Sequence, residues 1–288
     1  MALFNKASIQ LSLKLFKIRK PLQLVIFDKL FSKFILNLNN LNDSISKFHE
    51  DGFVKINLNI KNEIRNILKN LKINEEQKNP LLYYQITDEV KTQINVILNE
   101  KLKETLNTLE VYFNSKIMTA MINIRRNSHY KKNNFSHELY SDNFHNDAYA
   151  LTHFKMFINL MDIREENGPM HLISKKNTKK FFERINYKDR HNYNENININ
   201  DLLYNNIGKE GEILLFDPTQ CYHRATIPSL GCHRDYCIIT FICLPKKINL
   251  KKNSLDQVNI YNYEKNPLIK YAKPHSLFNT LKTFIKYL

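Results

Sequence analysis

The segment Phe144-His145-Asn146-Asp147 (FHND) places a histidine and a carboxylate two residues apart, and a second histidine, His223, follows 76 residues after the aspartate. On extended backbone, residues i and i+2 project to the same side, so His145 and Asp147 can reach one metal ion. Two histidines and one carboxylate form the facial triad that holds Fe(II) and leaves coordination positions open. The pattern therefore predicts an iron site carried by β structure.

Residues 211–223 (GEILLFDPTQCYH) lead into the second histidine. The apolar stretch Ile213–Phe216 predicts a strand, and the Asp-Pro pair that follows it predicts a turn. A short approach then ends at His223. This arrangement can deliver a third ligand from a strand that is distant in sequence.

Arg234 lies eleven residues beyond His223, beside the β-branched and aromatic run 236–242 (YCIITFI), which predicts a buried strand. A guanidinium in that position can bind a carboxylate ligand through two parallel hydrogen bonds. A surface salt bridge to Asp235 or Asp217 is the competing interpretation.

With these motifs, the chain resembles the phytanoyl-CoA dioxygenase family of Fe(II)/2-oxoglutarate oxygenases over residues 48 to about 245. The matching pieces are FHEDGFV (48–54), HND (145–147), FKMFINLMDIREENGP (154–169), GEILLFD (211–217), HRATIP (223–228) and Arg234. One departure is a turn after Asn-Gly-Pro, where the family has Pro-Gly-Ser-His and this chain has Ser174-Lys175-Lys176-Asn177.

The resemblance implies a role for each matched site residue. Iron is bound by His145, Asp147 and His223, the distal carboxylate of 2-oxoglutarate is held by Arg234, and the cosubstrate pocket includes Phe157 and Thr226. It also implies oxidation, most often hydroxylation, of an unactivated C–H bond with O₂, releasing succinate and CO₂. We expect a small-molecule or lipid/acyl substrate, although demethylation, epimerisation and ring closure use the same iron site.

Two other branches of these oxygenases fit less well. The nucleic-acid-repair branch carries a second arginine six residues after the first, and this chain has Thr240 there. No nucleic-acid partner is therefore expected. Peptidyl-prolyl hydroxylases use a lysine in place of Arg234. The alternative from another class is a non-catalytic, metal-binding jelly roll that acts as a binding or membrane-surface module.

The fold class that we expect is mainly β with flanking helices: a double-stranded β-helix (jelly roll, cupin-like) core buttressed by α-helices. We expect a single domain, residues 1–288, with its core at about 48–245 and basic helical extensions at both ends. Residues 9–16 (IQLSLKLF) alternate and predict a strand, and apolar spacing from Leu22 to Leu38 predicts a helix. Asp43 can cap a further helix, which Gly52 ends.

Three basic residues are candidates for contact with substrate. Strand alternation puts Lys155 on the same face as Phe157, and an inward lysine needs an anionic partner, either a substrate group or a structural carboxylate. Arg125 and Arg126 end the strand-like run 117–124 and can face the mouth of the site. A solvated charge pair is the equal alternative for these arginines.

Composition limits the class and location of the protein. The four cysteines at 221, 232, 237 and 243 show no CxxC spacing, which favours free thiols and a cytoplasmic location. The net charge of +15 is concentrated at the ends, with eight Lys/Arg against two acids in residues 1–47 and nine against two in 245–288. The simplest explanation of this charge distribution is that the lysines lie on solvent-exposed faces of helices. An apolar stripe over 277–288 flanked by lysines suggests peripheral association with an anionic membrane, or packing on the protein's own core.

Overall fold

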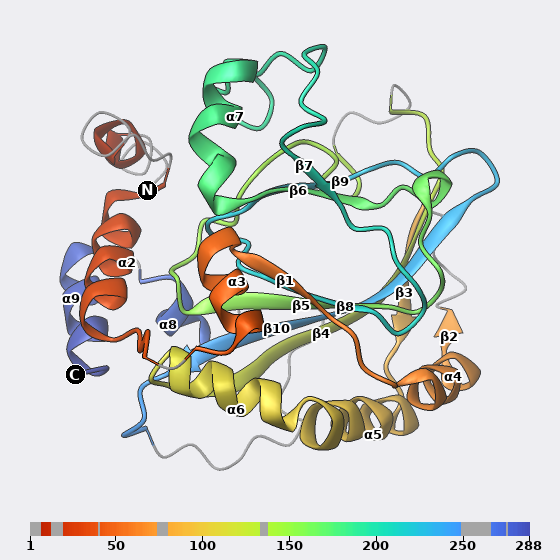
Figure 1. Ribbon diagram of the computed structural model, residues 1–288, viewed down its shortest axis with the longest axis horizontal. Coiled ribbons are helices and arrows are strands. Elements are labelled where there is room, and N and C mark those ends of the chain that lie inside the picture. The colour runs from red at the N-terminus through yellow and green to blue at the C-terminus, as the bar shows by residue number, and fades with distance from the viewer. Residues whose placement is uncertain are drawn as a thin grey trace.

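Two antiparallel sheets dominate the computed structural model, which describes residues 7–12, 20–39, 41–73, 80–132, 138–248, 266–274 and 276–288 (Figure 1). The seven-stranded sheet has the order β1-β8-β5-β10-β4-β3-β2, and the three-stranded sheet has the order β7-β6-β9. The strands are β1 Phe53–Ile56, β2 Lys72–Ile73, β3 Leu81–Gln85, β4 Lys116–Ser128, β5 His153–Asn159, β6 Met170–Ile173, β7 Leu203–Asn205, β8 Ile213–Phe216, β9 Tyr222–Ala225 and β10 His233–Leu244.

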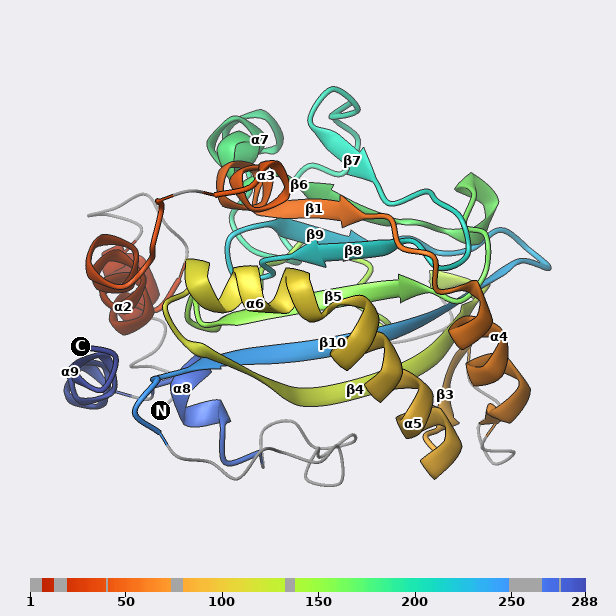
Figure 2. The same cartoon turned by 60° about the horizontal axis from the view of Figure 1, so that its bottom comes forward.

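Helices cover the outer face and one edge of the large sheet (Figures 1 and 2). The helices are α2 Leu22–Phe34, α3 Asp43–Asp51, α4 Lys61–Asn70, α5 Asp88–Val96, the π-helix η1 Ile97–Lys101, α6 Lys103–Tyr112, α7 Thr178–Ile185, α8 Ile269–Ala272 and α9 Leu277–Ile285, with 3-10 turns η3 Glu165–Asn167 and η4 Lys175–Asn177. The predicted fold class, a mainly β jelly roll with flanking helices, is confirmed.

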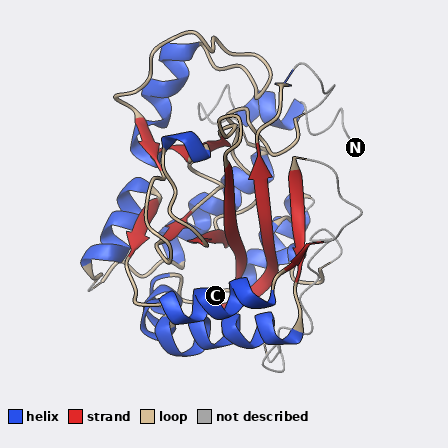
Figure 3. Ribbon diagram, turned by 90° about the vertical axis from the view of Figure 1, so that its right-hand side faces the viewer, coloured by secondary structure: helices blue, strands red, loops and turns tan. Residues whose placement is uncertain are grey.

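The outer face of the large sheet is held by aromatic packing under α6. Phe154 on β5 stacks on Phe241 of β10, with ring centroids 5.0 Å apart, and on Phe113 at the end of α6, at 5.3 Å. All three rings are almost fully buried. Aromatic burial of this size dominates the energetics of a core. The opposite, inner face of the large sheet lies toward the small sheet (Figure 1), and Figure 3 shows the strands in red from the side.

Strand register decides which side chains share that inner face. Thr240 of β10 lies opposite Lys155 of β5, and Tyr236 lies opposite both Asn159 of β5 and Arg125 of β4. Directly opposed residues point to the same side of a sheet. The predicted grouping of Lys155 with its i+2 and i+4 neighbours on one face is therefore what the register gives.

Three local predictions need correction. Residues 9–12 are helical, where the alternation predicted a strand, and the preceding Ser8 contacts α2, since its Oγ accepts a hydrogen bond from the Leu22 amide. Positions 13–16 of that prediction lie outside the described residues. Helix α2 ends at Phe34, short of Leu38. The cap of α3 is Asn42 rather than Asp43, since the Asn42 side chain accepts from the backbone N–H three residues on.

Residues 175–206, which are rich in Lys and Asn, contribute to a small second core. Phe181 and Ile185 of α7 are buried against Phe144 and Tyr222, the residues that precede the two histidines of the site. Tyr187 also donates a hydrogen bond to the Phe144 carbonyl at 2.9 Å. The stretch therefore braces the backbone that carries the candidate ligands.

None of the helices within the described ranges is long and apolar enough to cross a membrane.

Candidate metal centre and cosubstrate pocket

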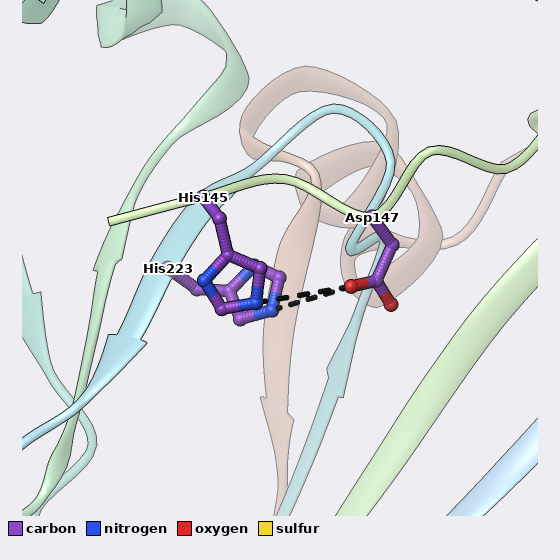
Figure 4. Close-up of side chains that lie close together, drawn as sticks. All are labelled: His145, Asp147 and His223. Atoms are coloured by element: carbon purple, nitrogen blue, oxygen red, sulfur yellow. Dashed lines mark ion pairs between the residues drawn. The ribbon is translucent and has the colours of Figure 1, made fainter. Parts of the chain in front are cut away.

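The two segments singled out in the sequence meet between the sheets. The backbones of His145 and His223 form an antiparallel bridge with N···O distances of 3.0 and 2.8 Å, and the Asp147 amide donates to the Pro218 carbonyl at 2.7 Å. One ligand atom from each of the three side chains lies within 4.8 Å of the others (Figure 4). Asp147 Oδ1 is 3.9 Å from Nε2 of each histidine. The spacing suits a single metal ion facing all three groups.

Backbone carbonyls orient both imidazoles. Nδ1 of His145 lies 2.9 Å from the Asn143 carbonyl, and Nδ1 of His223 lies 3.1 Å from the Cys221 carbonyl. A carbonyl can only accept, so each Nδ1 carries the proton and each Nε2 keeps its lone pair. Burial lowers the pKa of His145 and, aided by the neighbouring imidazole, lowers that of His223 to about 3. Both rings are therefore neutral near pH 7, as metal ligands must be.

Lys155 is paired with the carboxylate of the triad. Its Nζ lies 2.6 Å from Asp147 Oδ2, while Oδ1 of the same carboxylate faces the two imidazoles. Burial acts to raise the pKa of Asp147, but Lys155 and the surrounding histidines hold it below its usual range. Of the two partners expected for an inward lysine, the structure provides the protein carboxylate. This division of the two oxygens leaves one of them for a metal ion.

Arg234 lies on the inner face at the N-terminal end of β10, opposite Asn127 of β4. Its side chain is 5% exposed, its guanidinium carbon lies 5.1 Å from the centroid of the Tyr236 ring, and burial lowers its pKa. Within the described residues, the Nη1 of Arg234 and the Nδ2 of Asn127 have no hydrogen-bond partner. Buried donors of this kind are costly unless a ligand meets them. An anionic group placed between them would satisfy both.

The competing salt bridges for Arg234 are taken up elsewhere. Asp235 accepts two hydrogen bonds from Arg126, at 2.8 and 2.7 Å, on the opposite face of the sheet. Asp217 accepts from Thr219 and Gln220 in the turn after β8. Arg126 is thus held in a structural ion pair, which corrects the expectation that it faces the mouth of the site.

Arg125 and Arg126 are neighbours on β4, so their side chains point to opposite faces of the sheet. Arg125 lies on the inner face. Its Nε donates to the Tyr236 hydroxyl at 2.6 Å, and its guanidinium lies over the same ring at 5.1 Å. Burial acts to lower its pKa, but Tyr236 and Tyr83 raise it above the usual value. Two guanidiniums therefore flank one tyrosine ring, and neither has a carboxylate partner in the part of the chain that is described.

The two weaker cosubstrate predictions, Phe157 and Thr226, have different surroundings. Phe157 stacks on Tyr236 with ring centroids 5.4 Å apart, and its role toward a cosubstrate stays a prediction. Thr226 instead donates to the Pro169 carbonyl at 2.6 Å. Gly168 sits so close to this backbone that a Cβ there would lie 2.6 Å from the Thr226 carbonyl oxygen. In this arrangement Thr226 stabilises the neighbouring turn, and its role toward a cosubstrate stays a prediction.

Sequence reasoning missed Asn127 and Tyr236 as parts of the pocket. Tyr236 donates to Asn127 Oδ1 at 3.2 Å, which aims the amide nitrogen of Asn127 away from the ring. The only signal in the sequence was their i+2 spacing from Arg125 and Arg234, and Asn127 lies three residues beyond the predicted run 117–124, which β4 extends to Ser128.

No protein-family model matches this sequence, and no curated protein matches it. Among solved structures, similar folds include SnoN, the non-heme α-ketoglutarate-dependent epimerase of nogalamycin biosynthesis, with 12% identity and a TM-score of 0.47 over 71% of this chain and 85% of that one. HygX from Streptomyces hygroscopicus, with nickel and 2-oxoglutarate bound, has 12% identity and a TM-score of 0.48, covering 70% of this chain and 87% of that chain. EctD from S. alaskensis has 10% identity and a TM-score of 0.49, covering 79% and 86%. At these identities the likeness concerns the fold alone.

Proposed function

We propose that this chain is an Fe(II)- and 2-oxoglutarate-dependent dioxygenase, formed as one oxygenase domain with its core at about residues 48–245. The observation that carries the proposal is the pairing of two features in one pocket: three convergent ligand atoms within 4.8 Å, and a buried Arg234 whose Nη1 lacks a partner among the described residues. A facial triad provides three ligands and leaves three positions for other molecules.

The residues of the chain bind and orient rather than react. His145 and His223 would offer Nε2 to iron, and Asp147 would offer Oδ1 while Lys155 retains Oδ2. Arg234 would take the distal carboxylate of 2-oxoglutarate, with the Asn127 amide as a second donor. Bound Fe(II), 2-oxoglutarate and O₂ supply the oxidant for a C–H bond and release succinate and CO₂. Phe157 and Tyr236 would exclude water from the space between.

The substrate that we propose is a small molecule or a lipid/acyl compound, and hydroxylation is the first reaction to test. Arg125 and Arg234 add positive charge to the inner face, whereas Lys155 is paired with Asp147. Such a pocket favours substrates that carry an anionic group. An acyl or lipid substrate is met at a membrane, so the peripheral association suggested by the basic ends belongs to the same proposal.

The test is succinate release from 2-oxoglutarate by the Fe(II)-loaded protein, with and without pools of lipids, acyl thioesters and small metabolites. We expect slow release alone and faster release with one pool. A His145→Ala, His223→Ala double variant is the control and should release none. Metal binding without 2-oxoglutarate binding or turnover would favour the non-catalytic jelly roll instead.

A further inference from the structure

Helix α9 packs on α2 at one edge of the molecule (Figures 1 and 2). Phe284 meets Phe27 edge to face at 6.3 Å between ring centroids, and Tyr287 meets Phe31 at 5.1 Å. The Tyr287 hydroxyl donates to the Cys243 carbonyl at 2.7 Å. One side of the predicted apolar stripe is thus part of the protein's own core.

The rest of the stripe is exposed. The exposed side chains are Leu277 (50%), Phe278 (73%), Leu281 (44%), Ile285 (65%) and Leu288 (64%), with Phe34 (55%) at the end of α2. At 3.6 residues per turn, the five from the C-terminal segment fall within an arc of about 100°. Scattered exposed apolar residues need no explanation, but a continuous arc of this kind marks an interaction surface. We call these six residues the α9 face.

Lysines border the α9 face. Residues 266–288 contain four lysines and no Asp or Glu. Lys286 and Lys270 both lie over the Tyr271 ring, at 5.8 and 5.3 Å, and Lys33 lies over the Phe34 ring at 5.2 Å. The single acid of α2, Asp28, is already held by Lys20 and by the Leu151 amide. Within the described residues, Lys33, Lys270, Lys282 and Lys286 form no ion pair with a carboxylate.

We propose that the α9 face docks on an anionic lipid surface, with its apolar side chains in the acyl boundary and the flanking lysines at the headgroups. The proposal deepens the peripheral association of the proposed function by assigning its surface, and vesicle binding tests it independently of the iron chemistry. An apolar arc bordered by lysines is the pattern of helices that lie in a membrane interface. Anionic headgroups complement the surrounding lysines.

Two features of the α9 face favour lipid over a protein partner. A second copy of the chain, docked face to face about a twofold axis, would bring like lysine rows together, which opposes association. The face is also convex, because it is the exposed side of α9 with Phe34 of α2 beside it, so a protein partner would have to supply a matching groove. A lipid boundary adapts to the shape of the helix.

The test is co-sedimentation of the full chain with vesicles of phosphatidylcholine alone or mixed with phosphatidylserine, at low and high salt. We expect binding only to the anionic vesicles, weakened about tenfold or more by high salt because the lysines are screened. Equal binding to neutral vesicles, or no binding at low salt, overturns the proposal.

Point variants with matched controls separate the apolar and the charged parts. Phe278→Ser with Ile285→Ser should abolish vesicle binding, whereas Leu230→Ser, which removes an 83% exposed leucine elsewhere, should not change it. All three substituted side chains are exposed, so both variants should unfold at the same temperature as the parent. If the double variant binds vesicles like the parent, the α9 face is not the docking surface.

Two pairs of charge-reversal variants change the net charge by the same amount. Lys282→Glu with Lys286→Glu should weaken binding at least tenfold, whereas Lys69→Glu with Lys103→Glu, on the exposed sides of α4 and α6, should have a much smaller effect. Equal losses in the two pairs would mean that net charge alone drives binding, which contradicts a defined surface. A concentration-dependent dimer that the Phe278→Ser, Ile285→Ser variant loses would assign the face to a second copy.

Discussion

Replacing Arg234 by leucine should weaken 2-oxoglutarate binding strongly while iron remains bound. The guanidinium is 5% exposed and has no carboxylate partner among the described residues, so a bound dicarboxylate would gain its main charge-assisted contact there. Hydrogen bonds to charged groups contribute about 1.5–3 kcal/mol, and a buried carboxylate stranded without its partner loses more. With Asn127 left as a neutral donor, we expect a loss of about 2–4 kcal/mol, or roughly 30- to 1,000-fold in affinity.

Calorimetric titration of 2-oxoglutarate into the Fe(II)-loaded protein under anaerobic conditions measures this loss directly. The matched control is Arg126→Leu. Arg126 is the neighbour of Arg125 on β4 and is paired with Asp235 on the opposite face of the sheet. That variant should lose stability but keep its affinity for 2-oxoglutarate. Unchanged affinity in Arg234→Leu, or an equal loss in both variants, would refute the assignment of Arg234 to the cosubstrate carboxylate.

The remaining predictions concern the metal ligands and a buried histidine. Lys155→Met removes a cation beside the metal, so the metal should bind at least as tightly and 2-oxoglutarate roughly tenfold more weakly; weaker metal binding in calorimetry would contradict this. Asp147 occupies the position at which related halogenases leave room for chloride, so products should be oxygenated, and a chlorinated product by mass spectrometry would refute this. Burial, reinforced by Lys155, lowers the pKa of His153 to about 3 from 6.5, so its contribution to stability is present above pH 6.5 and lost as pH falls toward 3. Denaturant unfolding of the metal-free protein should show a loss of about 3 kcal/mol by about pH 4 that His153→Asn reduces, and equal pH profiles would contradict it.

The sequence pattern was enough to predict strand bounds and side-chain faces where the pattern lies within a single strand. The apolar stretch Ile213–Phe216 is β8 with the bounds that its sequence indicates. Alternation in β5 also placed Lys155 and Phe157 together on the inner face. The HxD spacing brought His145 and Asp147 to one point, although the backbone there forms a single bridge rather than a full strand. In each case the side-chain period of extended backbone is enough to decide the geometry.

The rest depended on partners that a single sequence does not name. Arg125 and Arg126 are adjacent, so one must face inward and the other outward, and only the register of β4 against β10 decides which. Apolar and polar residues alternate at 9–12 as in a strand, but the segment is helical and its neighbour Ser8 contacts α2. The Lys- and Asn-rich composition of 175–206 concealed Phe181, whose burial becomes evident only against Phe144. Tertiary contact overrides local propensity at these positions.

The most direct test of the metal centre is an anaerobic titration of Fe(II), followed by 2-oxoglutarate, into the metal-free protein, monitored by the charge-transfer absorption of the iron–2-oxoglutarate chelate. The arrangement of His145, Asp147 and His223 predicts one Fe(II) per chain, a band that saturates at one equivalent of 2-oxoglutarate, and loss of both in the His145→Ala, His223→Ala variant. Iron binding of equal strength in that variant, or iron bound in the parent with no chelate band at any 2-oxoglutarate concentration, would contradict it.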